Sequence, residues 1–212
     1  MPDDHHGFIP SSAEDVLRRR VKAELRKRMR GLRGALPAAA CSERSKRICL
    51  RLASLEPFAS ARTVALFWPM EDRHEVDLRE LDVLLRGRGI RVAYPAVGAD
   101  AAPLTYRFVA DTEAMQNHTS QGVVLREPRP NEPEAAPGDL DVVVIPALAV
   151  DPSGQRIGYG GGHYDRTLPR FTPPAASVVV AFDFQLIAEV PFTHGDVAAH
   201  YVVTDTRTLK AV

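Results

Sequence analysis

The stretch that decides the fold of this chain spans residues 141–166 and reads Asp141-Val-Val-Val-Ile-Pro146-Ala-Leu-Ala-Val-Asp151-Pro-Ser-Gly-Gln-Arg156-Ile-Gly-Tyr-Gly-Gly-Gly-His-Tyr-Asp-Arg166. Its first part, 142–145, is a continuous run of β-branched residues that stops at Pro146, which is typical of a strand buried on both faces. From Gly162 onward the sequence is compatible with a helix that continues to Phe171. A buried strand, a glycine-rich loop and a helix in succession indicate an α/β fold.

The same pattern continues on both sides of this stretch. Apolar or alternating runs bounded by proline and glycine predict further strands at residues 63–68, 90–94, 104–109, 177–182 and 201–204. Residues 110–139 are rich in Pro, Asn, Glu and Gly, and we interpret them as loop with one short extended piece near 123–125.

Helices are predicted between these strands. Ser12-x-x-Asp15 has the form of a helix N-terminal cap, and Pro37 ends the helix of about five turns that follows. An apolar stripe runs along this helix at three- and four-residue spacing and comprises Leu17, Val21, Leu25, Met29, Leu32 and Leu36. Further helices are expected at 40–55, with Ile48, Leu52 and Leu55 facing inward, and at 78–88.

Apolar strands that alternate with helices predict a mostly parallel sheet covered on both faces. With 212 residues, no internal repeat and no clear linker, we expect one α/β domain over residues 13–212, preceded by a flexible tail at 1–12. In such sheets ligands bind beyond the carboxyl ends of the strands. We therefore expect a binding site to include the residues that follow Trp68, Tyr94, Ile145 and Phe182.

Composition excludes several classes of function. Lys+Arg and Asp+Glu both number 27, so no overall charge draws the chain to nucleic acid or to an anionic membrane. No apolar run reaches about 18 residues, and the N-terminus has no apolar signal core. Cys41 and Cys49 lie eight residues apart on a predicted helix, roughly 12 Å, too far for a disulfide. Free thiols without zinc spacing are typical of a cytoplasmic protein.

The glycine-rich segment is the main candidate site. Four of the 14 glycines lie in the five positions 158–162, where backbone amides can approach an anion without a Cβ in the way. A helix starting near Gly162 would add its free amides, and Arg156 and Arg166 flank the loop. Neither the dinucleotide fingerprint nor the Walker loop fits. A phosphate site is favoured over a merely flexible loop.

Asp165 allows two interpretations. A carboxylate beside bound phosphate is repelled unless a cation lies between them, and magnesium takes one or two carboxylates together with phosphate oxygens. Asp165 is thus a candidate magnesium ligand. Equally, it caps its own helix or pairs with Arg166.

These residues, taken together, resemble a known family. Asp151-x-x-Gly-x-Arg156-x-Gly-x-Gly-x-Gly-x-Tyr164-Asp165-Arg166 is similar to the signature of the 5-formyltetrahydrofolate cyclo-ligases, also called methenyltetrahydrofolate synthetases. Weaker matches follow in the family's order: Lys22-Ala-Glu-Leu-Arg26, Phe67-Trp-Pro, Glu75-Val-Asp77, Glu127-Pro128, Ala181-Phe-Asp-Phe-Gln185, Pro191, Asp196 and Val203-Thr204. Gly161 stands where many members have Lys, and the loop before Glu75 is about two residues longer than usual.

The resemblance implies a fold and a reaction. The expected fold is a single-domain, three-layer, Rossmann-like sandwich of the NagB/RpiA/CoA-transferase type. The expected reaction is closure of 5-formyltetrahydrofolate, possibly polyglutamylated, to 5,10-methenyltetrahydrofolate through phosphorylation of the formyl oxygen, with ATP as co-substrate and Mg²⁺ as cofactor. A cytoplasmic monomer without a nucleic-acid or membrane partner is implied.

The resemblance also assigns residues. Tyr164 and Arg156 are the expected catalytic residues, and Asp165 and Asp196 the expected magnesium ligands. ATP is expected to contact Lys22, Arg26, Arg156, Ile157, Gly158, Tyr159, Gly160, Gly161, Gly162, His163 and Tyr164. The folate is expected to contact Trp68, with Phe67 as an alternative stacking ring, and also Glu75, Tyr159, Gly160, Gly161, Gly162 and His163.

Two other functions compete with this one. The chain could be a nucleotide-binding relative of the same fold that acts on another substrate or regulates without catalysis. Alternatively, the basic helix at 18–33, with nine Lys/Arg against one Glu, could bind RNA. The neutral total charge and the lack of an aromatic platform among its arginines argue against RNA.

Overall fold

A computed structural model describes residues 13–98, 102–120 and 123–211. The predicted tail at 1–12 and the capping residue Ser12 lie outside the described residues. The helices are α1 (Ala13–Gly34), α2 (Ala38–Ala53), α3 (Glu56–Ala59), α4 (Arg79–Gly87) and α5 (His163–Phe171), with short 3-10 turns η1 (Glu71–Arg73), η2 (Thr112–Ala114) and η3 (Asp183–Gln185). No described helix is long and apolar enough to cross a membrane.

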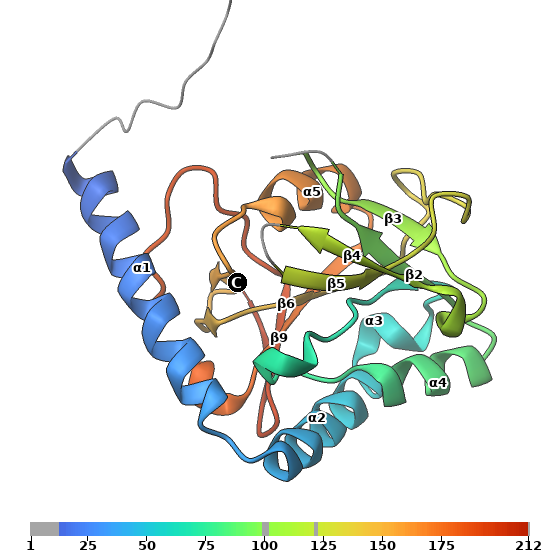
Figure 1. The fold of residues 1–212 in the computed structure, drawn as a ribbon, viewed down its shortest axis with the longest axis horizontal. Coiled ribbons are helices and arrows are strands. Elements are labelled where there is room, and N and C mark those ends of the chain that lie inside the picture. Colours follow the sequence, from blue (N-terminus) through green and yellow to red (C-terminus); the bar gives the residue numbers. More distant parts are fainter. Residues whose placement is uncertain (1–12, 99–101, 121–122, 212) are drawn as a thin grey trace, which may run out of the picture.

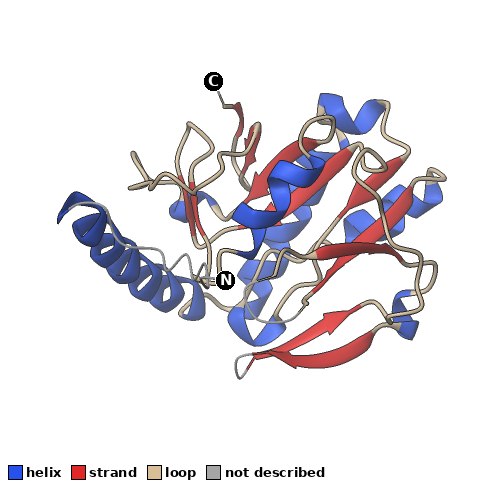
Figure 2. Ribbon diagram, turned by 90° about the horizontal axis from the view of Figure 1, so that it is seen from above, coloured by secondary structure: helices blue, strands red, loops and turns tan. Residues whose placement is uncertain are grey.

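The described strands form one large sheet and two small ones (Figures 1 and 2). The large sheet has the order β11-β10-β9-β6-β1-β2-β3. Its five inner strands run parallel and its two edge strands antiparallel. The bounds are β1 (Thr63–Ala65), β2 (Arg91–Ala96), β3 (Thr105–Phe108), β6 (Val142–Pro146), β9 (Ala176–Val180), β10 (Tyr201–Val203) and β11 (Thr208–Lys210).

The central strand β6 shows why its sequence is apolar throughout. Side chains alternate between the two faces of a strand. Val142 and Val144 join the core under α2, α3 and α4, whereas Val143 and Ile145 join a second core on the opposite face, which includes Leu168 of α5. Helices therefore cover both faces, and the predicted single-domain, three-layer α/β fold with a mostly parallel sheet is confirmed.

Two small hairpins stand beside the sheet. One pairs β7 (Ala149–Val150) with β8 (Arg156–Ile157), and Met29 of α1 packs against it. The other pairs β4 (Gln116–Ser120) with β5 (Val123–Glu127). The prediction of loop at 110–139 missed β4, because its sequence, Gln-Asn-His-Thr-Ser, is polar and carries no apolar alternation. The edge strand β11 was missed for the same lack of an apolar pattern.

Helix α1 is arranged differently from an ordinary amphipathic helix. Half of its predicted stripe is exposed, including Leu17 at 61% and Leu32 at 46%, and only Met29 of the stripe is buried. Two basic residues, Lys22 and Arg33, are buried instead. The helix runs along the side of the domain (Figure 1), and Lys22 lines the cavity at the carboxyl ends of the parallel strands.

Candidate active site

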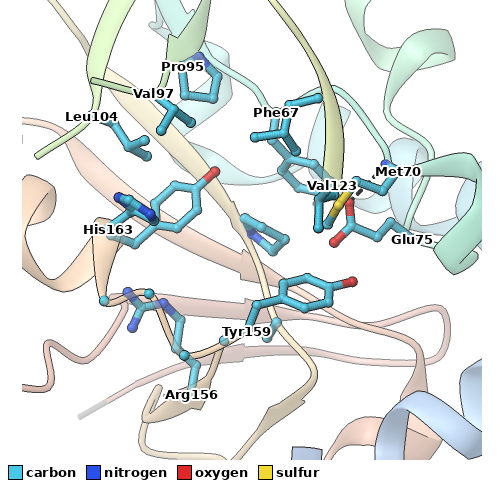
Figure 3. Close-up of a pocket in the computed structure, with 18 of the residues that line it drawn as sticks. Phe67, Met70, Glu75, Pro95, Val97, Leu104, Val123, Arg156, Tyr159 and His163 are labelled. Atoms are coloured by element: carbon cyan, nitrogen blue, oxygen red, sulfur yellow. Dashed lines mark hydrogen bonds between the residues drawn. The ribbon is translucent and has the colours of Figure 1, made fainter. Parts of the chain in front are cut away.

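A cavity of about 500 Å³ opens at the carboxyl ends of β1, β2 and β6. Phe67, just after β1, and Pro95 and Pro146, at the ends of β2 and β6, lie in its wall, where parallel strands place ligands. The remaining walls are α1, the glycine loop with the start of α5, and the β4–β5 hairpin (Figure 3).

The glycine loop follows β8 and leads into α5. Gly160 and Gly162 have φ angles of +114° and +64°, a backbone region that favours glycine. Arg26 lies against this loop, because its Nε donates to the Gly158 carbonyl at 2.9 Å and a Cβ on Gly160 would come 3.7 Å from its guanidinium. Arg26, one of the two α1 cations predicted to contact ATP, thus lies directly against the glycine loop.

A tight turn at residues 151–155 precedes β8 and the glycine loop. The buried Asp151 accepts hydrogen bonds from Ser153, Gln155 and Val190. Gly154 has a φ of +81°, and a Cβ there would lie 2.2 Å from the Ala199 carbonyl oxygen. The turn places Arg156 at the start of β8, facing the pocket.

Arg156 links the chain segments on this side of the pocket. Its side chain is 4% exposed, and its Nη1 donates to Asp165 Oδ1 at 2.9 Å. The guanidinium lies 5.9 Å from the Tyr164 ring centroid. Asp165 thus pairs with Arg156, and not with Arg166, whose Nη2 donates to the Gly161 carbonyl at 2.6 Å.

Tyr164 is held in its neutral form. Loss of hydration raises the pKa of its hydroxyl well above the usual value, nearby Tyr106 and Glu75 add to this rise, and Arg156 opposes it. At neutral pH Tyr164 therefore keeps its hydroxyl proton and is available as a hydrogen-bond donor, not as a phenolate base.

Lys22 and Asp196 meet across the pocket mouth. The Lys22 ammonium donates to Asp196 Oδ2, which also accepts from the Thr193 amide. Burial raises the pKa of Asp196, but these donors outweigh burial and the pKa is lowered. The carboxylate is thus ionised at neutral pH and oriented by the cation that the sequence predicts to bind ATP.

An acidic residue is buried at the other end of the pocket. Glu75 follows η1, its side chain is 3% exposed, and its Oε2 accepts the Met70 amide at 3.0 Å (Figure 3). Its Oε1 has no hydrogen-bond partner among the described residues. A buried carboxylate oxygen without a donor is costly, so this atom marks a place where a ligand's N–H groups fit.

Aromatic side chains lie beside Glu75. Phe67 is buried and Trp68 half-buried, and both line the pocket. The Arg126 guanidinium sits 4.8 Å from the Trp68 ring centroid, and the Tyr94 ring packs at 5.9 Å. Trp68 is thus fixed by protein partners, while stacking of either ring on a ligand stays a prediction.

The glycine at position 161 has a local explanation. A Cβ there would come 2.8 Å from the His163 ring, which itself contacts the Ala102 carbonyl through Nδ1 at 3.3 Å. A larger residue at 161 therefore requires His163 to move. Other cations reach the pocket, since Arg30, Arg73 and Arg126 line it in addition to Lys22, Arg26 and Arg156.

The acidic groups fit a magnesium ion only in part. Over the described ranges, no group of three or more His, Cys, Asp or Glu side chains converges on one point. Asp165 lies in the pocket wall, and the hydrogen bonds it accepts from described residues fall on Oδ1, which leaves Oδ2 open. Such a site suits an ion held mainly by phosphate oxygens.

The predicted residues are brought together. Lys22, Arg26, Trp68, Glu75, the loop 156–165 and Asp196 all line the same pocket. The hairpin residues Val123, Leu125 and Arg126 and the basic residues Arg30, Arg73 and Arg33 were missed, because they lie in a segment interpreted as loop or on a helix with many surface charges. The buried position of Arg33 follows only from how α1 packs.

Comparisons with known proteins agree with this arrangement. Residues 18–205 match the model of the 5-formyltetrahydrofolate cyclo-ligase family. The chain is 33% identical to the 5-formyltetrahydrofolate cyclo-ligase of Mycolicibacterium smegmatis, over 91% of this chain and 98% of the relative. It is 30% identical to the Escherichia coli K12 enzyme of that name, over 84% and 97%.

Solved structures agree as well. The NMR structure of Aquifex aeolicus 5,10-methenyltetrahydrofolate synthetase superimposes with a TM-score of 0.75 at 27% identity, covering 90% of this chain and 92% of that one. The Mycoplasma pneumoniae synthetase superimposes with a TM-score of 0.68 at 26% identity, covering 87% and 98%.

Proposed function

This chain belongs to the 5-formyltetrahydrofolate cyclo-ligase family, and we propose that its pocket converts 5-formyltetrahydrofolate and ATP into 5,10-methenyltetrahydrofolate, ADP and phosphate. One observation carries the proposal. A single cavity joins a glycine loop surrounded by cations to a buried carboxylate with an open oxygen. The first end suits a triphosphate, and the second suits the N–H and amino edge of a pterin.

The chemistry requires two steps. A formamide oxygen is a poor leaving group, so it first attacks the γ-phosphorus of ATP, and ADP departs. The neighbouring folate nitrogen then attacks the activated formyl carbon, loses its proton, and expels phosphate. Catalysis of phosphoryl transfer is mostly positioning and charge neutralisation, which is what a cavity lined by fixed cations and backbone amides provides.

The position of each residue in the pocket suggests its role in binding or catalysis. Lys22, Arg26 and the amides of the glycine loop hold phosphate oxygens, and Arg156 neutralises charge on the transferred group. Tyr164 donates its hydroxyl proton in a hydrogen bond to the formyl or phosphate oxygen. Glu75 accepts the pterin N–H groups. A Mg²⁺ ion, when bound through Asp165 with Asp196 as a second or outer partner, would neutralise phosphate charge.

The direct test is to incubate the purified chain with ATP, Mg²⁺ and 5-formyltetrahydrofolate and to follow the methenyl absorbance. We expect one ADP for each methenyl product, and no product when ATP or Mg²⁺ is omitted. A folded protein that hydrolyses or binds ATP without forming product would overturn the proposal in favour of a relative with another substrate.

Replacement of Lys22 by methionine should affect ATP specifically. We expect the KM for ATP to rise about tenfold to a hundredfold, because a hydrogen bond to a charged group contributes roughly 1.5–3 kcal/mol. The KM for the folate should change little. Lys27→Met, an exposed lysine on the same helix, is the matched control and should leave both constants unchanged. A rise in the folate KM alone would contradict the assignment of Lys22 to ATP.

A further inference from the structure

At the acidic end of the pocket, the buried Arg33 and Glu75 cluster with the half-buried Tyr159. The Arg33 and Glu75 side chains are each 3% exposed, and Arg33 Nη1 lies 4.0 Å from Glu75 Oε1. Arg33 Nη2 donates to the Tyr159 hydroxyl, and the guanidinium lies 5.6 Å from that ring's centroid. Glu75 and Tyr159 point toward each other in the pocket (Figure 3). Arg33 is not part of the pocket wall.

The loop that carries Glu75 is held in place from the same side. His74 has a φ of +48°, which is uncommon for a residue with a side chain. Its ring Nδ1 lies 3.2 Å from the Arg33 carbonyl, so the helix residue that faces Glu75 also anchors the turn before it. Backbone strain of this kind persists when surrounding contacts require it.

We propose that Arg33 is a positioning residue, whose guanidinium, from outside the pocket, stabilises the ionised form of Glu75 and leaves Oε1 without a hydrogen bond from the described residues. The proposal rests on the proposed function only for the identity of the ligand that Glu75 meets. An ionised carboxylate accepts several N–H donors, whereas a protonated one presents a donor of its own to them. The charge state of Glu75 therefore decides whether the pterin edge fits.

The charges around Glu75 support this role. Burial keeps the pKa of Glu75 above its usual value, and Arg33 is the strongest of the groups that oppose this rise, ahead of the Met70 amide, Tyr159 and Arg73. Tyr159 itself stays neutral, because burial and Glu75 raise its pKa. Three elements face the carboxylate: Arg33 comes from α1, Arg73 from η1 and Tyr159 from the glycine loop. Among the described residues, Arg33 is the only cation facing the carboxylate that is buried.

The sign of the pH effect follows. Affinity for the folate falls as the pH drops through the pKa of Glu75, because the acid form accepts fewer hydrogen bonds and turns an O–H donor toward the pterin donors. Without Arg33 that pKa rises further, and the fall begins at higher pH. An opposite charge this close shifts a carboxyl pKa by about 1–3 units, so affinity at neutral pH is expected to drop about tenfold or more.

The experiment measures 5-formyltetrahydrofolate affinity against pH, without ATP, for the wild type, Arg33→Met, Glu75→Gln and the double variant. We expect Arg33→Met to move the acid limb upward by about one unit or more. Glu75→Gln should bind weakly with no such limb, and adding Arg33→Met to it should change little. Arg28→Met, an exposed arginine on α1, is the control and should behave as the wild type.

A second measurement is independent of the ligand. The carboxyl ¹³C resonance of Glu75, identified by its loss in Glu75→Gln, is titrated in the unliganded protein with and without Arg33. An unchanged midpoint overturns the role of Arg33, even if the folate affinity falls. If Arg33→Met does not fold while the double variant does, an unpaired buried carboxylate is the cause, which supports the proposal. If neither variant folds, the same titration is carried out on Arg33→Gln, which keeps hydrogen-bonding groups without the charge. Its Glu75 midpoint then tests the role of the Arg33 charge. A wild type that binds no folate would instead overturn the proposed function.

Discussion

Replacement of Arg156 by methionine lowers kcat/KM for cyclisation by about a hundredfold to a thousandfold, the usual effect of removing one preorganised donor from a site of developing charge. Three properties of Arg156 make this effect large. Its side chain is 4% exposed, so water cannot substitute for it. It lies against the Tyr164 ring, and its Nη1 also lies 3.3 Å from the Val197 carbonyl. The loss of one side chain therefore disturbs the Tyr164 and Asp165 positions together.

Arg156→Lys separates charge from geometry. Lysine keeps the charge but lacks the planar fork that reaches Asp165 and a phosphate oxygen at once, so we expect an intermediate loss of about tenfold. Steady-state kinetics with both substrates is the measurement, and circular dichroism checks that each variant is folded. Arg170→Met, an exposed arginine on α5, is the control. Wild-type kcat/KM in folded Arg156→Met would remove Arg156 from the reaction.

Replacement of Gly154 by alanine is expected to destabilise the fold more than alanine at any other glycine in the described part of the chain. The new Cβ would lie 2.2 Å from the Ala199 carbonyl oxygen, which belongs to the backbone and cannot rotate away. The residue also keeps a φ of +81°. Overpacking costs about 1–3 kcal/mol and the left-handed backbone about 1–2 kcal/mol more, so we expect a loss of roughly 2–5 kcal/mol. For a domain of this size that lowers Tm by about 5–15 °C.

Gly89→Ala is the matched control for this prediction. Gly89 has nearly the same φ, +77°, but no atom lies within 4 Å of its added Cβ. It therefore reports the backbone strain alone, about 1–2 kcal/mol. Thermal unfolding of both variants measures the difference. Equal Tm values would show that the turn at Gly154 relaxes around the methyl group and that the contact with Ala199 is not rigid.

Local sequence patterns predicted the elements whose formation depends on residues close by in the sequence. The continuous run at 142–145, its proline and the glycines at 158–162 predict a buried strand, a loop and a helix, because burial on both faces and positive φ each require particular residue types. The polar strand β4 lacked such a pattern. It forms because β5 pairs with it, and Glu127 of β5 accepts the Val97 amide at the end of β2.

The sequence by itself determined the α/β class, the glycine loop with Arg156, Tyr164 and Asp165, and, through resemblance to a family, many of the residues that line the pocket. Only the tertiary structure decided which charges meet. Lys22 reaches Asp196, 174 residues away, and Arg33 lies behind Glu75 although both helix positions look alike among nine basic residues in the sequence. The physical reason is that the spacing of apolar residues on α1 reports only the local periodicity of the helix, and not the partner against which the helix packs. The face that α1 buries is set by its contact with the β7–β8 hairpin and the pocket, which no local pattern contains.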